Sequence, residues 1–179
     1  MEETLNLSFR SARIEDADTI KRIVNMAYRD GSDTAGWSNE AHLISGNRIE
    51  KNHIIDIINK PNIAILVALS HDNIVASMCV EKLNHQESYL SMLAVEPKFQ
   101  SRGIGRRMFA EIEEYSRLTF GAQTYVLEVI TLRNDLILFY NRLGYQQTGQ
   151  ISEFPFSSVV GESLVGSLYL ERMEKHRKC

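Results

Sequence analysis

The spacing of hydrophobic residues changes several times along the chain, and each change predicts a secondary-structure element. Apolar and polar residues alternate over residues 5–13, which predicts a short strand. Apolar residues then recur at helical spacing over 17–28, so a helix with one buried face is predicted there, with Asp16 as its N-cap. The same spacing predicts a second helix over about 47–60, which Pro61 ends.

Three apolar runs follow, at residues 63–69, 74–82 and 88–95. Short polar turns separate these runs, which are therefore predicted to form consecutive antiparallel strands. A long helix is predicted over 103–119, because apolar residues recur there on one face. The acidic residues on its other face, Glu113 among them, are expected to face water.

The last third of the chain adds strands and one short helix. The expected elements are a strand over 124–130, a helix over 135–143, a loop over 151–163, and strands over 145–149 and 164–173. Together the pattern predicts an α+β fold, with a mixed, mostly antiparallel sheet of about seven strands flanked by about four helices. No linker or repeat interrupts the pattern, so residues 1–179 are expected to form a single domain.

Composition limits the classes of partner. The formal net charge of −3 argues against nucleic acid as the main partner. No apolar run approaches the ~20 residues of a membrane-spanning helix, and the first residues lack the basic and apolar regions of a signal peptide. Cys79 and Cys179 predict no disulfide framework, and the five histidines show no metal-ligand spacing. A cytoplasmic protein without a bound metal or a membrane partner is therefore expected.

A basic, glycine-bearing loop lies between the third apolar run and the helix that follows it. Its sequence is Gln100-Ser101-Arg102-Gly103-Ile104-Gly105-Arg106-Arg107. Glycines let the backbone approach a ligand closely, and the unpaired N–H groups of a helix start favour an anion. The loop therefore predicts a phosphate or pyrophosphate site, with a structural tight turn as the alternative. It lacks the Gly-Lys-Ser/Thr ending of nucleotide-hydrolase phosphate loops and the third glycine of dinucleotide-binding loops.

Two stretches resemble signatures of the GCN5-related N-acetyltransferase (GNAT) family. The first resembles the family's acyl-CoA-binding motif and consists of the loop just described and the strand end before it, Met92-Leu93-Ala94-Val95-Glu96-Pro97. The second resembles the family's short helix ending in Tyr-x-x-x-Gly-Phe/Tyr and reads Phe139-Tyr140-Asn141-Arg142-Leu143-Gly144-Tyr145. The order of predicted strands and helices over about residues 5–173 also resembles the family fold.

The resemblance implies that acetyl-CoA binds as a cosubstrate. Backbone groups of Leu93 and Val95 would pair with its pantetheine arm, and the loop N–H groups would hold its pyrophosphate. The full set of implied acetyl-CoA-binding residues is Leu93, Ala94, Val95, Gln100, Ser101, Arg102, Gly103, Ile104, Gly105, Arg106, Arg133, Asn134 and Phe139. Many members carry an asparagine where this chain has Arg133, and the chain resembles a subgroup with arginine there. Either Arg133 replaces that contact or the turn is shifted to Asn134.

The resemblance also implies catalytic residues. Tyr140 stands where the family places the tyrosine that protonates the leaving CoA thiolate, and the alternative is a core aromatic residue. An amine with a pKa of ~10.4 must lose a proton before it attacks a thioester. Glu128, twelve residues before Tyr140, is the first candidate for that base, because bacterial acetyltransferases of ribosomal-protein amino termini carry a glutamate there. A solvent-facing strand residue is the alternative for Glu128, and Glu87 and Tyr89 are the other candidates.

Two backbone and core features complete the predicted chemistry. A backbone N–H near Leu93, at the end of its strand, is expected to stabilise the oxyanion that forms on the thioester carbonyl. Cys79 lies in an apolar run without an adjacent histidine, so it is interpreted as an inert core residue and not as an acyl carrier.

The sequence therefore predicts an N-acetyltransferase that transfers the acetyl group of acetyl-CoA directly, in a ternary complex, to a primary amine of a small molecule or a peptide. The alternative is a non-catalytic acyl-CoA-binding sensor or interaction module. The resemblance alone also implies a possible homodimer that forms through the final strands. The acceptor pocket is expected in the loops around 30–45 and 150–163. The alternative for the first loop is a surface connection whose Trp37 side chain packs on the hydrophobic core. The candidate lining residues are Arg29, Asp30, Asp33 and Trp37.

Overall fold

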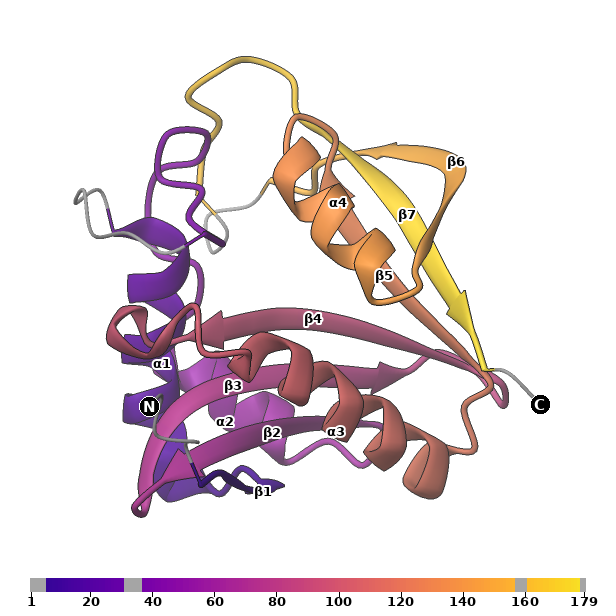
Figure 1. The fold of residues 1–179 in the computed structure, drawn as a ribbon. Helices are drawn as coiled ribbons and strands as arrows, with labels where there is room; N and C mark the ends of the chain where they lie inside the picture. The colour runs from indigo at the N-terminus through magenta and orange to yellow at the C-terminus, as the bar shows by residue number, and fades with distance from the viewer. Residues whose placement is uncertain (1–5, 31–36, 157–160, 178–179) are drawn as a thin grey trace.

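The computed structural model describes residues 6–30, 37–156 and 161–177, which form a seven-stranded sheet with helices on both of its faces (Figure 1). In chain order the elements are β1 (Ser8–Ser11), the 3₁₀ turn η1 (Ile14–Asp16), α1 (Ala17–Arg29), α2 (Lys51–Ile58), β2 (Ile63–Ser70), β3 (Asn73–Lys82), β4 (Glu87–Val95), the 3₁₀ turn η2 (Pro97–Phe99), α3 (Ile104–Phe120), β5 (Thr124–Ile130), α4 (Asn134–Arg142), β6 (Gln146–Glu153) and β7 (Tyr169–His176). Within these described ranges, no helix is long and apolar enough to cross a bilayer.

The strands lie in the order β1-β2-β3-β4-β5-β7-β6. Neighbours from β1 to β4 are antiparallel, which confirms the predicted run of consecutive antiparallel strands. β5 is parallel to β4, and β5, β7 and β6 are again antiparallel. α3 supplies the long connection that a parallel pair needs. The mixed, mostly antiparallel α+β fold is therefore confirmed.

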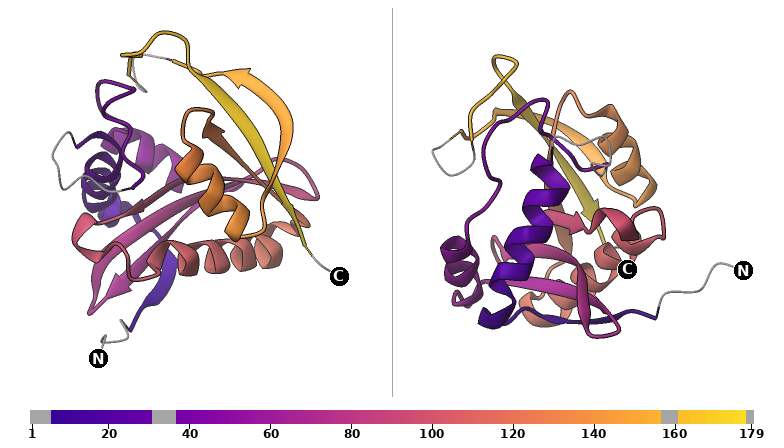
Figure 2. Two further views of the ribbon diagram at one scale, coloured as in Figure 1. Left: turned by 45° about the horizontal axis from the view of Figure 1, so that its top comes forward. Right: turned by 90° about the vertical axis from the view of Figure 1, so that its left-hand side faces the viewer.

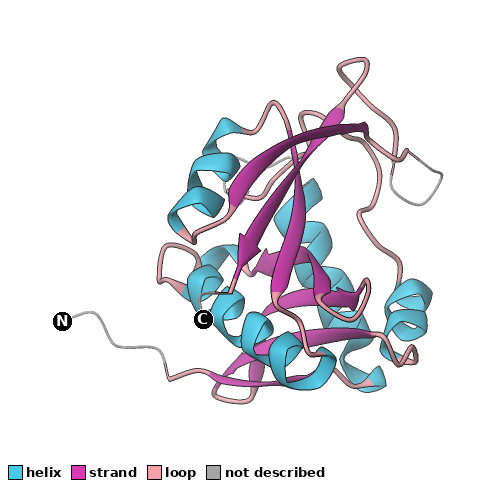
Figure 3. Cartoon of the chain, turned by 90° about the vertical axis from the view of Figure 1, so that its right-hand side faces the viewer, coloured by secondary structure: helices cyan, strands magenta, loops and turns pink. Residues whose placement is uncertain are grey.

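Both faces of β2 and β3 are buried, which explains their unbroken apolar sequences. On one face, residues such as Leu66 join a cluster with Met108 and Ile112 of α3. On the other face, their neighbours such as Val67 join a cluster with Ile23 of α1. Figures 1 and 3 show α3 on one side of these strands and α1 with α2 on the other. Each helix therefore turns its apolar stripe to the sheet and its polar side outward.

β4 and β5 separate soon after they meet. Their register covers only 87–89 of β4 opposite 124–126 of β5. Beyond it, β4 carries one extra residue relative to 77–79 of β3, and Met92 adopts a left-handed φ of 53°. Such a bulge bends and twists its strand. β4 and β5 consequently diverge like the arms of a V, with β7, β6 and α4 on the β5 arm (Figures 1 and 2).

Apolar contacts support the second arm. Leu136 and Ile137 of α4 are buried in the same cluster as Val129 of β5. A separate cluster joins Leu43 and Ile44, in the loop before α2, to residues of β5 and β7. The long loop between the first two helices is thus fastened to the far arm of the V.

All the predicted elements are present, but several boundaries differ. The first strand covers only 8–11, and the helix predicted over 47–60 covers only 51–58. Residues 151–153, predicted as loop, extend β6, and the last strand lies over 169–176. β6 is an edge strand whose residues are all exposed, so its sequence carries no alternation that would mark its end.

Two polar side chains have partners that the sequence did not predict. Asp16 occupies the N-cap position of α1, but its carboxylate binds Arg10 (2.6 Å) and the Arg13 N–H (2.7 Å) instead of the helix. Glu113 does not simply face water. It accepts hydrogen bonds from the Tyr145 hydroxyl (2.8 Å), just before β6, and from Lys175 (2.6 Å) of β7, so it links α3 to both.

Candidate active site

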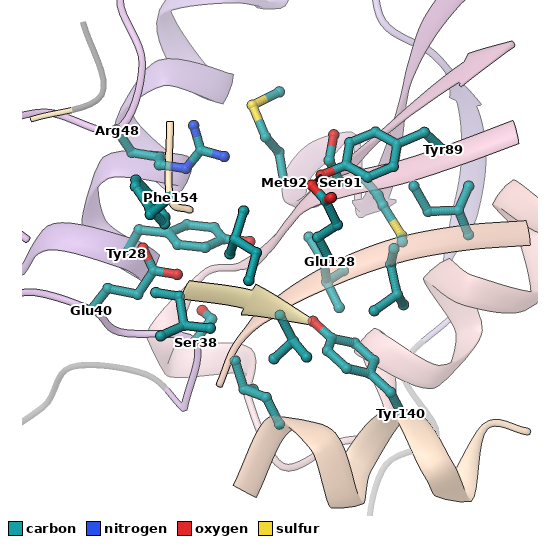
Figure 4. Close-up of a pocket in the computed structure, with 18 of the residues that line it drawn as sticks. Tyr28, Ser38, Glu40, Arg48, Tyr89, Ser91, Met92, Glu128, Tyr140 and Phe154 are labelled. Atoms are coloured by element: carbon teal, nitrogen blue, oxygen red, sulfur yellow. Dashed lines mark hydrogen bonds between the residues drawn. The ribbon is translucent and has the colours of Figure 1, made fainter. Parts of the chain in front are cut away.

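A cavity of about 260 Å³ opens where β4 and β5 diverge (Figure 4). Its walls come from α1, the loop between α1 and α2, β4, β5, α4 and the loop after β6. The polar side chains that reach it include Tyr28, Glu40, Arg48, Tyr89, Glu128 and Tyr140. The divergence of the two strands thus collects chemically active groups from segments that are distant in sequence.

Tyr140 reaches the cavity from α4, and Figure 4 shows its hydroxyl pointing inward. Its ring packs edge-on against Phe109 (5.8 Å between centroids) and Tyr145 (6.4 Å). Burial, with smaller contributions from Tyr28 and Glu40, raises the pKa of Tyr140 well above its usual range. The phenol therefore carries its proton at neutral pH, and no described residue accepts a hydrogen bond from it.

Glu128 enters the cavity from β5. It is exposed and accepts a hydrogen bond from the hydroxyl of Tyr89 (3.2 Å). Arg172 lies opposite Glu128 on β7, but its guanidinium pairs with Glu87 (3.4 Å) and Glu174 (2.7 Å). Among the described residues, Glu128 consequently has no ion-pair partner, whereas Glu87 is paired and does not line the cavity.

The glycine-bearing loop begins α3 beside this cavity. Gly103 has a φ of +73°, in the left-handed region that favours glycine, and nothing lies within 4 Å of the position of an added Cβ. No described acceptor receives a hydrogen bond from the backbone N–H groups of 101–106, and the first helical bond runs from the Arg107 N–H to the Gly103 carbonyl (3.2 Å). The loop therefore presents the unpaired N–H groups that suit an anion.

Gly105 marks a close approach of three segments. An added Cβ would lie 3.6 Å from the side chain of Leu93 and 3.7 Å from the rings of Phe139 and Trp37. The Trp37 and Phe139 rings are themselves 4.6 Å apart. Because Leu93 and Trp37 also line the cavity, the glycine loop, β4 and α4 meet at its edge.

Two side chains hold the Trp37 segment against this edge. Gln100 accepts a hydrogen bond from the Trp37 N–H (3.3 Å) and donates one to the last carbonyl of β4 (3.1 Å). Arg133 is buried, with 7% exposure, and donates to the carbonyls of Trp37 and Asn39 (2.8 Å to Asn39). It also pairs with Asp135 (2.8 Å). The Arg133 guanidinium therefore ties α4 to the loop between α1 and α2.

The predicted site residues divide into two groups. Leu93, Glu128 and Tyr140 line the cavity together. The others lie around it: Phe139 beside Gly105, the side chain of Ala94 on the α1 face of the sheet, and those of Arg102, Arg106 and Asn134 at the exposed surface. Any contact of this outer group with a ligand would be made outside the cavity.

The predicted acceptor residues divide in the same way. Trp37 lines the cavity and also packs on Phe139. Arg29 contributes indirectly, because it pairs with the cavity residue Glu40 at 2.7 Å. Asp30 does not line the cavity, and Asp33 lies outside the described residues.

Three ionisable residues of the cavity, Tyr28, Glu40 and Arg48, were not predicted as site residues. Tyr28 belongs to the apolar face of α1, so its pattern indicated core. Glu40 lies in a loop without periodicity, and Arg48 falls at the start of the helix predicted over 47–60, so no sequence signal distinguishes them from ordinary surface charges. Arg48 places its guanidinium 5.6 Å from the centre of the Tyr28 ring. Only the folded loop brings these groups to β4 and β5.

Cys79 lies buried in β3, and burial raises the pKa of its thiol to about 12. It therefore stays protonated at neutral pH, as an inert core thiol does. Across the described parts of the chain, no three residues among His, Cys, Asp and Glu gather as the ligands of a metal ion would.

Comparisons with known proteins agree with this geometry. A sequence model described as "Acetyltransferase (GNAT) family" matches residues 26–145. A search of curated protein sequences found no match. An N-acetyltransferase from Staphylococcus aureus Mu50 has a similar structure, with a TM-score of 0.72 and 14% identity over 96% of this chain and 97% of that one.

Two further solved structures are similar over nearly their full length. A ribosomal-protein-alanine N-acetyltransferase from Brucella melitensis has a TM-score of 0.69 and 19% identity, over 95% of this chain and 99% of that chain. The structure of yncA from Salmonella typhimurium "with its cofactor Acetyl-CoA" has a TM-score of 0.70 and 17% identity, over 97% and 95% of the two chains.

We predict that Arg133→Ala releases the Trp37 segment. Removing charged hydrogen bonds to two carbonyls should lower the free energy of unfolding by about 1.5–3 kcal/mol. The emission of Trp37, the single tryptophan, should move to longer wavelength and become easier to quench with acrylamide. Arg142→Ala, an exposed arginine on the same helix, is the control and should change neither property. An unchanged emission in Arg133→Ala would show that the clamp is not needed.

Proposed function

The chain belongs to the acetyltransferase (GNAT) family, and we propose that it transfers the acetyl group of acetyl-CoA directly to a primary amine in a ternary complex. The observation that carries the proposal is the cavity between β4 and β5. A protonated tyrosine and a carboxylate face it, and a loop of N–H groups begins at its edge; within the described part of the chain, neither the carboxylate has an ion-pair partner nor the N–H groups an acceptor.

Acetyl-CoA fits this arrangement in charge and in shape. Its pyrophosphate would accept hydrogen bonds from the N–H groups of 101–106 at the positive end of α3. Its pantetheine arm would lie along Leu93–Val95, where β4 has left β5 and can accept an added strand. An added Cβ at Gly105 would lie in van der Waals contact with Leu93 and Phe139, so the loop backbone passes close to both.

Acetyl-CoA supplies an activated acyl group, and the chain supplies the proton transfers. The amine nitrogen bonds to the thioester carbonyl carbon, and the carbon–sulfur bond then breaks. Glu128 would take the proton that the amine loses, and the Tyr140 hydroxyl would donate a proton to the departing sulfur. A backbone N–H near Leu93, beside the bulge at Met92, would stabilise the charge that develops on the carbonyl oxygen.

A non-catalytic acyl-CoA sensor is the second candidate. It would need the glycine loop and the β4 edge, but it would not need an acid and a base that face the same cavity. The inward hydroxyl of Tyr140 and the carboxylate of Glu128 therefore favour an enzyme. Release of CoA thiol from acetyl-CoA in the presence of an amine panel distinguishes the two.

Replacing Tyr140 with phenylalanine should lower kcat about 100-fold or more, because a general acid typically contributes 10²–10⁴-fold. The affinity for acetyl-CoA should stay unchanged, since only the hydroxyl is lost. Steady-state kinetics and calorimetry measure the two quantities. Tyr115→Phe, on the partly buried Tyr115 of α3, is the matched control. Normal turnover in Tyr140→Phe would remove the residue from the mechanism.

Glu128→Gln tests the proposed base. It should lower kcat/KM about 100-fold at neutral pH. The deficit should shrink towards pH ~10.4, where a typical amine acceptor loses its proton unaided. Glu111→Gln, an exposed glutamate on α3, is the control and should follow the wild-type pH profile. A deficit that is equal at every pH would assign Glu128 a different role.

Gly103→Val tests the pyrophosphate site. A branched residue at φ +73° should lower the free energy of unfolding by about 1–2 kcal/mol and should misplace the loop N–H groups. The affinity for acetyl-CoA should fall roughly tenfold or more, because charged hydrogen bonds are lost. Gly149→Val is the matched control, since Gly149 has a φ of +79° and open space around it but lies in β6. Equal calorimetric affinities for the two variants would contradict the assignment.

A further inference from the structure

One positive charge in the cavity has no role in the proposed chemistry. Arg48 lines the cavity from the loop before α2, and Figure 4 shows its side chain reaching inward beside Tyr28. Its guanidinium lies 5.6 Å from the centre of the Tyr28 ring. It has no carboxylate within ion-pair distance among the described residues. Arginine is thus presented to the cavity with its hydrogen-bond donors uncommitted.

The position of Arg48 is held by α1. The side-chain oxygen of Asn25 accepts hydrogen bonds from the backbone N–H groups of Arg48 (2.6 Å) and Ile49 (3.2 Å). The amide nitrogen of Asn25 donates to the carbonyl of Ile49 (2.9 Å). This clamp and the tyrosine ring beneath the guanidinium define where the charge lies, as a preorganised ligand contact requires.

Of the two carboxylates that line the cavity, one already has an ion-pair partner. Glu40 lines the same cavity, but Arg29 pairs with it at 2.7 Å, and both side chains are largely buried. Across the cavity, the Tyr89 hydroxyl is the one described partner of Glu128. The cavity therefore holds two uncompensated charges of opposite sign, a guanidinium on the α1–α2 loop and a carboxylate on β5.

Both charges influence the pKa of Tyr89. Burial and the charge of Glu128 raise its pKa, whereas the charge of Arg48 acts in the opposite direction. The same guanidinium counteracts the burial that raises the pKa of Tyr28. The charge of Arg48 therefore influences Tyr89 on β4 and Tyr28 on α1, which line the cavity from different segments.

From this placement we infer that the acceptor is a small amine that also carries a carboxylate, which Arg48 binds while the amine lies towards Glu128. The inference rests on the proposed acetyl transfer. A planar guanidinium binds a carboxylate with two parallel hydrogen bonds. A volume of about 260 Å³ lies below the usual range for drug-sized ligands, so a free amino acid suits the cavity better than a larger acceptor.

Matched acceptors test the inference. The panel contains free amino acids, their carboxamides and the amines that remain when the carboxylate is removed, with amine-to-carboxylate spacings from one to three carbons. CoA thiol release is measured with acetyl-CoA for the wild-type protein, Arg48→Gln, Arg48→Lys and Arg48→Glu. Arg177→Gln, an exposed arginine outside the cavity, is the control.

We expect the wild-type protein to prefer the carboxylate-bearing member of a set. Arg48→Gln should lower kcat/KM for that acceptor about tenfold to a hundredfold, as loss of a charged hydrogen-bonded pair does. It should leave kcat/KM for the carboxylate-free amine and the affinity for acetyl-CoA unchanged. Arg48→Lys should recover part of the loss, because it keeps the charge but not the planar fork. Arg48→Glu should reverse the preference within a set.

Two results would overturn the inference while acetyl transfer stands. One is wild-type preference for amines without a carboxylate. The other is an equal loss in Arg48→Gln for all members of a set, which would indicate a general effect on the cavity. A protein that binds acetyl-CoA but acetylates no amine in any set would instead contradict the proposed function itself, and the inference with it.

Discussion

The early separation of β4 and β5 is the constraint on which the rest of the site depends. The two strands are parallel neighbours for only a short register, and a bulge at Met92 then turns β4 away. A closed sheet would cover the backbone groups of Leu93–Val95 and leave no space between the strands. Because the strands diverge, β4 keeps a free edge and a cavity forms beside it. The proposed pantetheine contact, the proposed base and the proposed acid all require this opening.

An opening of this kind needs support, since two arms of a sheet that no longer share hydrogen bonds must be held by other contacts. The loop between α1 and α2 provides them. Arg133 fastens it to α4, Gln100 fastens it to the end of β4, and an apolar cluster around Leu43 fastens it to β5 and β7. The Arg133 guanidinium is therefore committed to partners within the protein.

The distribution of charge gives the cavity its chemical character. The charges of buried pairs such as Arg29 with Glu40 compensate each other, so these residues form part of the cavity wall and need no ligand as a partner. Glu128 and Arg48 are different, because each faces the cavity without an ion-pair partner in the described part of the chain. Tyr140 adds a proton that burial prevents from dissociating at neutral pH. Such a cavity favours a ligand that carries both charges, and the proposed proton acceptor and donor both reach it from the β5 arm.

The sequence by itself determined the order of strands and helices, the glycine loop at the start of α3, and the short helix that carries Tyr140. These are local properties, because periodicity and turn chemistry act over a few neighbouring residues. It did not reveal that Arg133 is a buried clamp or that Arg48 reaches the cavity. Both depend on a loop without periodicity, and their partners lie far away in sequence. Only the tertiary structure could decide them, since long-range packing determines which polar groups find partners and which remain for a ligand.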